Sequence, residues 1–182
     1  MEGAVGVLEI ASVARGIMVT DTCLKTANIQ LLFAQPVCPG KYLIIIGGEV
    51  AAVQAALEAV DLEPTSEIVD KTLLGNIHPD VFAAIAGQTP VNMEGALGVV
   101  ELFTVPAGIL AADLCAKAAV VQLIDLQMAR GLGGKAVLYI RGEVGAVSMA
   151  IKAVEKQFGQ EGLLGATAII AAPHPELWPK IW

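Results

Sequence analysis

The sequence predicts a protein of the α/β (α+β) class, made of two copies of one small domain with an antiparallel-type sheet. Two observations lead to this prediction: a repeat that covers the whole chain, and an alternation of short apolar runs with helical patterns inside each copy. Three blocks recur in the same order: residues 4–10 (AVGVLEI) as 96–102 (ALGVVEL), 48–50 (GEV) as 142–144, and 78–79 (HP) as 174–175. The unit of roughly 90 residues is well above solenoid periods of about 20–50. We therefore expect domains at residues 1–88 and 93–182.

The first half of the unit reads as strand, helix, strand and turn. Residues 5–10 form a short β run, and residues 12–27 predict a helix in which Asp21 and Lys25 are spaced i, i+4. Residues 29–33 predict a strand that ends before Gln35-Pro36. The tripeptide Cys38-Pro39-Gly40 then predicts a turn, because proline fixes φ and glycine frees it.

The second half of the unit begins with a continuous apolar strand at residues 42–46. A helix follows, with apolar residues at helical spacing in both copies: Val50, Val53, Leu57 and Val60, then Val144, Val147, Ile151 and Val154. A weaker strand is expected at residues 68–74, and Pro79 opens a short last helix. The order β-α-β-β-α-β-α is a ferredoxin-like split arrangement with helices packed alongside the sheet, and residues 88–92 link the copies.

The composition is unusually apolar for a monomer of 182 residues, with 55% hydrophobic and 16% charged residues and a mean hydropathy of +0.69. The longest suggestive run, residues 163–175, contains His174 and two prolines and is shorter than the roughly 18–20 residues of a membrane span. We expect no membrane partner. Burial in an obligate oligomer is the better explanation for the apolar excess.

Charge and cysteine content exclude further classes. A net charge of −7 and an aromatic content of 4% argue against nucleic acid as a partner. The three cysteines show no CxxC spacing, and the strand pattern begins by Ala4, which leaves no room for a signal peptide. We therefore expect a cytoplasmic protein with reduced thiols.

The order of the blocks resembles the bacterial microcompartment (BMC) shell domain, in both copies and over essentially the whole chain. The residues that carry the resemblance are 6–9 (GVLE), 21–28 (DTCLKTAN), 39–41 (PGK) and 47–53 (GGEVAAV), then 113–119 (DLCAKAA), 133–135 (GGK) and 141–147 (RGEVGAV). The resemblance implies a non-enzymatic shell protein located in a microcompartment shell. A tandem member is expected to form a pseudo-hexameric homotrimer that assembles with other shell proteins.

The resemblance also assigns residues to the edge of such a tile. Lys25 and Lys117 match the lysine through which neighbouring tiles contact one another, and His78 and His174 belong to the partner motif of that edge. An arginine often precedes Pro-His in this motif, whereas Ala172 stands before Pro173-His174 here. The missing bidentate donor predicts that this protein is a minor tile held by its neighbours' residues.

The three cysteines differ in how they fit the repeat. Cys23 and Cys115 are in register beside apolar residues, so both are expected in the core as small hydrophobes. Cys38 is matched by Leu132 in the second copy, so the shared fold does not require sulfur there. The residues of the two matching loops are expected to line a central pore by resemblance: Val37, Cys38, Pro39, Gly40, Gly131, Leu132, Gly133 and Gly134.

The loop at residues 37–41 resembles that of a tandem family member that carries an iron–sulfur cluster on its three-fold axis. Iron–sulfur clusters normally take four thiolates, and thiolate is the soft ligand that their irons prefer. The resemblance therefore implies one [4Fe–4S] cluster per trimer, bound through Cys38 of each subunit. Its expected role is electron transfer across the shell to a redox partner enzyme. The alternative is a structural tile or metabolite pore in which Cys38 only lines the opening.

Other candidate sites are weaker. Residues 131–135 (GLGGK) do not form a phosphate loop, because Ala136 follows in place of Ser or Thr and a strand comes next. His78 and His174 each precede a proline at an expected helix start, with no nucleophile or carboxylate pattern that would suggest catalysis. A small-molecule regulator with ferredoxin-like domains is a third possibility, which would require a ligand pocket.

Overall fold

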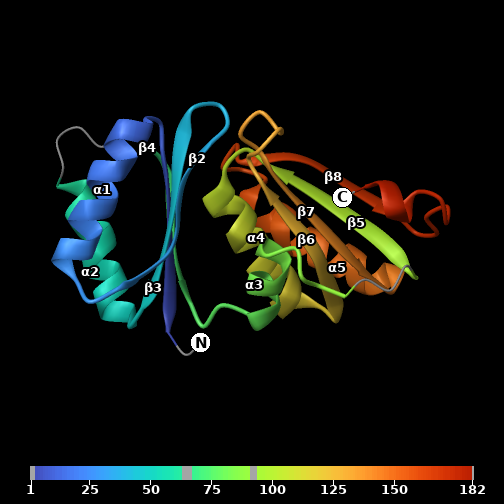
Figure 1. Ribbon diagram of the computed structural model, residues 1–182. Helices are drawn as coiled ribbons and strands as arrows, with labels where there is room; N and C mark the ends of the chain where they lie inside the picture. Colours follow the sequence, from blue (N-terminus) through green and yellow to red (C-terminus); the bar gives the residue numbers. More distant parts are fainter. Residues whose placement is uncertain (1–2, 63–66, 91–93, 182) are drawn as a thin grey trace. The chain divides into compact units, whose positions relative to one another are not determined.

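A computed structural model describes residues 3–62, 67–90 and 94–181 of the chain (Figure 1). It contains two compact units, each built around a four-stranded antiparallel sheet with packed helices. The first unit comprises residues 1–77 together with 104–106 and 129–134, and the second comprises the remainder. The predicted fold class is confirmed. The domain boundaries at 88 and 93 stay a prediction, and residues 91–93 lie outside the described part of the chain.

The first unit follows the predicted order of elements. These are β1 (Ala4–Ile10), α1 (Val13–Thr26), β2 (Gln30–Val37), β3 (Lys41–Gly48), α2 (Val50–Asp61) and β4 (Ile68–Gly75). The sheet order is β2-β3-β1-β4, so β1 and β3 are central and β2 and β4 are edge strands. Apart from Glu9 and Lys41, the central strands have no charged residues, because both of their faces are buried over most of their length.

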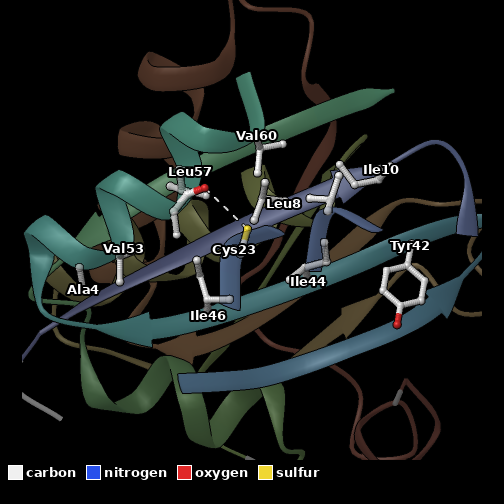
Figure 2. Close-up of a cluster of buried hydrophobic side chains, with 12 residues drawn as sticks. Ala4, Leu8, Ile10, Cys23, Tyr42, Ile44, Ile46, Val53, Leu57 and Val60 are labelled. Atoms are coloured by element: carbon white, nitrogen blue, oxygen red, sulfur yellow. Dashed lines mark hydrogen bonds between the residues drawn. The ribbon is translucent and has the colours of Figure 1, made fainter. Parts of the chain in front are cut away.

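Helices α1 and α2 cover one face of this sheet and enclose a core of aliphatic side chains (Figure 2). Leu8 and Ile10 of β1 and Ile44 of β3 meet Val53 and Leu57 of α2 in this core. Helix α1 begins where the sequence predicts, because the Ser12 side chain accepts a hydrogen bond from the Arg15 amide. Strand alternation thus directs one set of side chains of β1 and β3 toward the helices.

Strand β2 is longer than the sequence predicts. The expected end before Gln35-Pro36 is wrong, since β2 continues through Val37 and Pro36 pairs with Tyr42. A proline has no backbone N–H and cannot donate a hydrogen bond to a neighbouring strand. In an edge strand, the N–H groups of alternate residues face away from the sheet, so a proline at such a position removes no bond between strands. The position of β2 at the sheet edge therefore accommodates Pro36 and carries the strand up to Cys38.

The second unit repeats this topology with sheet order β6-β7-β5-β8. Its elements are α3 (Pro79–Ile85), β5 (Ala96–Leu102), α4 (Val105–Ala118), β6 (Val121–Met128), β7 (Ala136–Gly142), α5 (Val144–Phe158), β8 (Leu164–Ile170) and a 3₁₀ turn, η1 (Trp178–Lys180). Helix α3 packs beside β6 and begins with Pro79 as predicted. The first two residues of α4 are grouped with the first unit.

The end of the second repeat departs from the duplication. We expected His174-Pro175 to open a helix, but these residues lead into turns and the short η1 segment. Trp178 of η1 is buried against Leu97 and Ile124. The tryptophan anchors the chain to its own sheet, and this packing replaces a regular helix. Within the described residues, no helix is long and apolar enough to cross a membrane.

Candidate functional site

Cys38 lies at the tip of the hairpin between β2 and β3, where residues 38–40 form the turn. The Gly40 amide donates to the Val37 carbonyl (3.0 Å), and Gly40 has φ +81°, which favours glycine over other residues. Cys38, Pro39 and Gly40 are exposed, whereas the side chain of Val37 is buried in the first unit. The hairpin thus presents a free thiol to solvent, with the strand residue before it anchored in the core.

The matching loop of the second repeat is longer and rich in glycine. Five residues separate the paired Pro36 and Tyr42, but seven separate the paired Met128 and Ala136. Gly131, Gly133 and Gly134 all have positive φ, which allows this wider turn. Counted from the second strand of the hairpin, Leu132 is the partner of Cys38, and counted from the first strand it is Arg130. Neither residue is a thiol, so the loop of the first repeat alone carries sulfur.

The two loops come together within the first unit. A Cβ atom placed on Gly134 would lie 2.9 Å from Cδ of Pro39 and 3.1 Å from the carbonyl oxygen of Cys38. The Arg130 guanidinium also donates a hydrogen bond to the Gln35 side chain. Gly134 therefore fits against the Cys38-Pro39 peptide because it has no side chain. Which of the predicted pore residues line an opening stays a prediction.

Cys23 and Cys115 are buried in the cores, as predicted, and differ from Cys38 chemically. The Cys23 thiol donates to the Ala56 carbonyl at 3.7 Å, and the Cys115 thiol donates to the Ala150 carbonyl at 3.8 Å (Figure 2 shows the first contact). Burial raises the pKa of Cys23 to about 11 and the pKa of Cys115 to about 12. A buried thiol held in its neutral form is a poor nucleophile and a poor metal ligand.

One copy of the chain does not assemble a metal site by itself. In residues 3–62, 67–90 and 94–181, no group of three His, Cys, Asp or Glu side chains could hold a metal ion. Of the three cysteines, all of them in this part of the chain, Cys38 is the exposed one. Its donor chemistry fits an iron–sulfur cluster, provided that further thiolates come from other copies of the chain.

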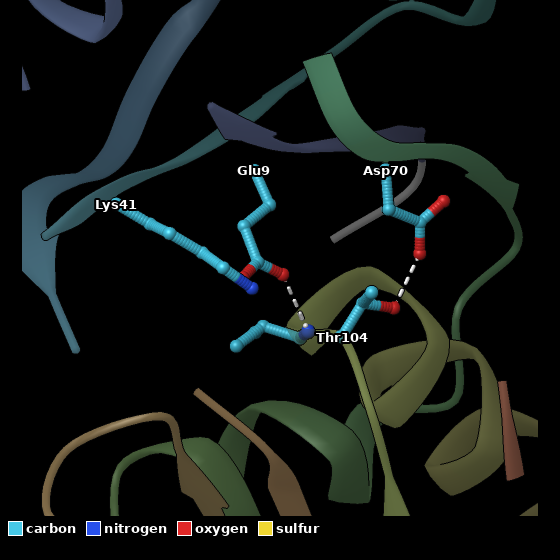
Figure 3. A network of polar contacts seen from close by, with 5 residues as sticks. Glu9, Lys41, Asp70 and Thr104 are labelled. Atoms are coloured by element: carbon cyan, nitrogen blue, oxygen red, sulfur yellow. Dashed lines mark hydrogen bonds and ion pairs between the residues drawn. The ribbon is translucent and has the colours of Figure 1, made fainter. Parts of the chain in front are cut away.

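Lys41, which directly follows the Cys38 turn, belongs to a polar network that the sequence patterns do not predict (Figure 3). The Glu9 carboxylate is fully buried, pairs with Lys41 (2.7 Å) and accepts a hydrogen bond from the Val105 amide (2.9 Å). Next to it, the Thr104 hydroxyl donates to Asp70. In the sequence, Glu9 recurs as Glu101 within matching strand blocks, and this repetition alone indicates only a structural role. Lys41 likewise recurs as Lys135, and each lysine pairs with the glutamate of its own repeat. This joint recurrence of a lysine and a glutamate is the sequence signal that could have indicated the ion pair.

Of the four residues predicted at the tile edge, Lys25 and Lys117 lie on helices, His78 lies at a helix start, and His174 lies directly before a turn. Lys25 pairs with Asp21 (2.5 Å), and Lys117 pairs with Asp113 (2.6 Å), whose other oxygen accepts the His78 amide at 2.8 Å. The His78 ring accepts the Asp80 amide at 3.3 Å and so caps α3, and the His174 ring accepts the Glu176 amide in the same way. Their role in contacts between tiles stays a prediction.

Comparison with known proteins agrees with this architecture. The family description "BMC domain" matches residues 4–77 and 96–173. The bacterial microcompartment shell protein PduT of Citrobacter freundii is 39% identical over 181 residues, covering 100% of this chain and 98% of that protein. The crystal structure of a microcompartment protein from Desulfitobacterium hafniense DCB has a TM-score of 0.85 and 38% identity over 97% of this chain and 98% of the other.

A more distant solved structure is similar to most of the chain. The fused permuted hexameric shell protein of the RMM microcompartment has a TM-score of 0.65 and 25% identity, covering 85% of this chain and 80% of the other. Proteins with BMC domains are structural shell components rather than enzymes, and they assemble with other shell proteins. With two matches to one family description and a full-length relative, the chain belongs to the BMC-domain family of bacterial microcompartment shell proteins.

Proposed function

We propose that three copies of this shell protein form a tile whose central opening holds one [4Fe–4S] cluster through Cys38 of each copy. The observation that carries the proposal is the exposed, free Cys38 thiol on a loop whose counterpart in the second repeat has no sulfur. The fold does not require a cysteine at this position, which distinguishes it from the buried Cys23 and Cys115. The resemblance of residues 37–41 to the loop of a cluster-bearing tandem member supports the same assignment.

The donor count agrees with a three-fold site. A single chain supplies one exposed thiolate, whereas three copies would supply three of the four ligands that a [4Fe–4S] cluster normally takes. The fourth iron would then be open to water or another ligand. A bound cluster would supply one-electron redox chemistry, and we propose electron transfer across the shell to a redox partner enzyme. The residues of this chain would bind the cluster, and the turn at Pro39-Gly40 would hold the thiol toward solvent.

The competing function is a structural tile or metabolite pore without a cluster. The glycine-rich loop at residues 131–134 is compatible with a pore rim as much as with a cluster site. In this alternative, Cys38 is one small side chain at the opening and the chain has no redox role.

Iron and sulfide analysis of anaerobically purified protein separates the two functions. We expect about four irons and four acid-labile sulfides per three chains, and a low-temperature EPR signal after reduction. Cys38→Ser should lose both, whereas Cys115→Ala, which changes a buried thiol, should keep them. Protein without iron or sulfide, and a Cys38→Ser variant with an unchanged spectrum, would leave the tile or pore without a cluster as the function.

A further inference from the structure

The second repeat contains an incomplete copy of the Glu9 network. Glu101 occupies the position of Glu9, because each lies on a central strand and is followed by a register shift toward the next edge strand. Each also pairs with a lysine at the start of the neighbouring strand: Lys41 is the first residue of β3, and Lys135 directly precedes β7. The distance from Lys135 Nζ to the Glu101 carboxylate is 2.8 Å, against 2.7 Å for Lys41 and Glu9. The duplication has therefore preserved the ion pair.

The two ion pairs differ in how much solvent they meet. The side chains of Lys41 and Glu9 are 18% and 0% exposed, whereas those of Lys135 and Glu101 are 40% and 36% exposed. Glu9 is covered by residues 104 and 105 at the start of α4, which belong to the first unit. The Thr104 hydroxyl donates to Asp70, and the Val105 amide donates to Glu9. Among the described residues, Lys135 is the partner of the Glu101 carboxylate, and no helix start covers it.

The segment equivalent to the start of α4 is the start of α1. Ser12 and Val13 occupy the positions of Thr104 and Val105 in the repeat, and Val13 is the first residue of its helix, as Val105 is. The first amides of a helix have no acceptor within the helix, and a carboxylate at this positive end is stabilising. In the described residues the Val13 amide has no acceptor. It is therefore free to donate to a carboxylate, as the Val105 amide donates to Glu9.

We propose that Glu101 of one copy accepts a hydrogen bond from the Val13 amide of a second copy, which docks the start of its α1 beside Glu101 and Lys135. The occupant is a second copy of this chain, because it supplies the segment that the duplication matches to residues 104–106. The contact is head-to-tail, since one copy uses Glu101 and the other uses Val13. Heterologous contacts of this kind close into rings when the rotation permits. The number of copies in the ring rests on the proposed trimer.

The substitution Val13→Pro tests the contact, because it removes the donor and keeps the helix. Proline is favoured at the first helical position. Ser12 has φ −130° and ψ 132°, the extended conformation that a residue before proline adopts. Val13→Ala is the matched control, since it shortens the same side chain and keeps the amide. Glu101→Ala removes the acceptor from the other side of the contact.

The dissociation constant of the assembly is measured by sedimentation equilibrium, with circular dichroism to show that each variant is folded. All variants are compared in the Cys38→Ser background, so that no cluster holds the copies together. We expect Val13→Pro and Glu101→Ala each to raise the dissociation constant at least about tenfold, as for hydrogen bonds to charged groups. The double variant should be little worse than either single one, because both remove the same contact.

Three outcomes would overturn the inference, and each is distinct from failure of the cluster. Additive effects of Val13→Pro and Glu101→Ala would show that the two residues do not contact each other. A Val13→Ala variant as weak as Val13→Pro would assign the effect to the side chain and not to the amide. The chain with its native Cys38 is measured beside these variants. If it is monomeric at all concentrations, both this contact and the proposed trimer are overturned, whereas an assembled native chain that contains no iron after anaerobic purification would overturn the cluster alone.

Discussion

Gly16 of helix α1 lies directly against the Tyr42 side chain of strand β3. A Cβ atom on Gly16 would come within 2.3 Å of the Tyr42 Cβ and 2.4 Å of its Cγ. The second repeat preserves the same approach, because a Cβ on Gly108 would lie 2.4 Å from the Cβ of Ala136. In both repeats the first helix therefore reaches its sheet through a position that only glycine can occupy.

Gly16→Ala should lower the free energy of unfolding by about 1–3 kcal/mol, because the added methyl group forces the helix away from a close-packed sheet. Urea denaturation followed by circular dichroism measures the change. Gly145→Ala in α5 is the matched control, since a Cβ there meets nothing within 4 Å. That control should be neutral or stabilising by about 0.5–1 kcal/mol. Equal losses in the two variants would contradict the close approach of α1 and β3.

Glu9→Ala and Glu101→Ala should differ in their effect on the fold. Glu9 is fully buried, and its removal leaves Lys41 and the Val105 amide without their partner, which should cost about 3–5 kcal/mol. Glu101 is partly exposed in the single chain, and its loss should cost at most about 1 kcal/mol in dilute protein. Urea denaturation at low protein concentration compares them. A larger loss for Glu101→Ala would show that the exposed pair matters more to the folded chain than the buried one.

The two glutamates also show where sequence reasoning was limited. The repeat, the strands and the helices followed from local apolar patterns, and Cys23 and Cys115 were placed in the core correctly. The hydrogen bond from Val105 to Glu9 joins residues 96 positions apart, and no local pattern indicates such a contact. The predicted end of β2 was wrong because a proline ends a central strand but is tolerated in an edge strand. The position of β2 at the edge follows from the sheet order, which the local sequence around Pro36 does not indicate.

Ala166→Asp should strengthen the assembly, because it would give the second repeat the carboxylate that Asp70 supplies in the first. Asp70 pairs with Glu9 across the sheet and accepts the Thr104 hydroxyl, and Ala166 pairs with Glu101 in the same register. The equivalent of Thr104 in a second copy is Ser12. We expect the dissociation constant to fall about three- to tenfold, as for one added hydrogen bond.

The gain from Ala166→Asp should depend on the Ser12 hydroxyl. The same substitution in a Ser12→Ala background should give no gain, and sedimentation equilibrium compares the four proteins. An equal gain in both backgrounds would mean that the new carboxylate acts through another residue. This comparison is independent of iron and can be made with Cys38→Ser protein.

The three thiols should react at very different rates in the folded protein. Iodoacetamide at neutral pH, added after iron has been removed, should modify Cys38, while Cys23 and Cys115 react only on unfolding because they are buried. Mass spectrometry of peptides measures the label at each position. Labelling of Cys23 at the rate of Cys38 would contradict the burial of α1 against α2.

Stability should decline at high pH through the same two buried thiols. Burial raises the pKa of Cys23 and Cys115 from 9.0 to about 11 and about 12. Because the folded values are above the unfolded value, their contribution is complete below pH 9 and is lost as the pH rises toward 11–12. Burial also raises the pKa of Tyr139, which acts in the same direction.

The slope of unfolding free energy against pH between 9 and 11 therefore identifies the thiol contribution. Cys23→Ala should reduce this slope relative to wild type, although it lowers stability at neutral pH by removing buried sulfur. Cys38→Ser serves as the matched control, because it removes a thiol on the surface and leaves both buried cysteines in place. Identical slopes for wild type and Cys23→Ala would contradict the raised pKa.

The contact between Val105 and Glu9 has a consequence for how a tile grows. Because both residues belong to one polypeptide, this contact forms without a second molecule and is independent of protein concentration. A ring built from single-repeat subunits must form every such contact by collision, and the entropy of each free subunit is lost in the process. A chain with the contact already made should complete its ring at lower concentration and release fewer partial rings. Expression level would then affect the abundance of finished tiles less than it does for single-repeat shell proteins.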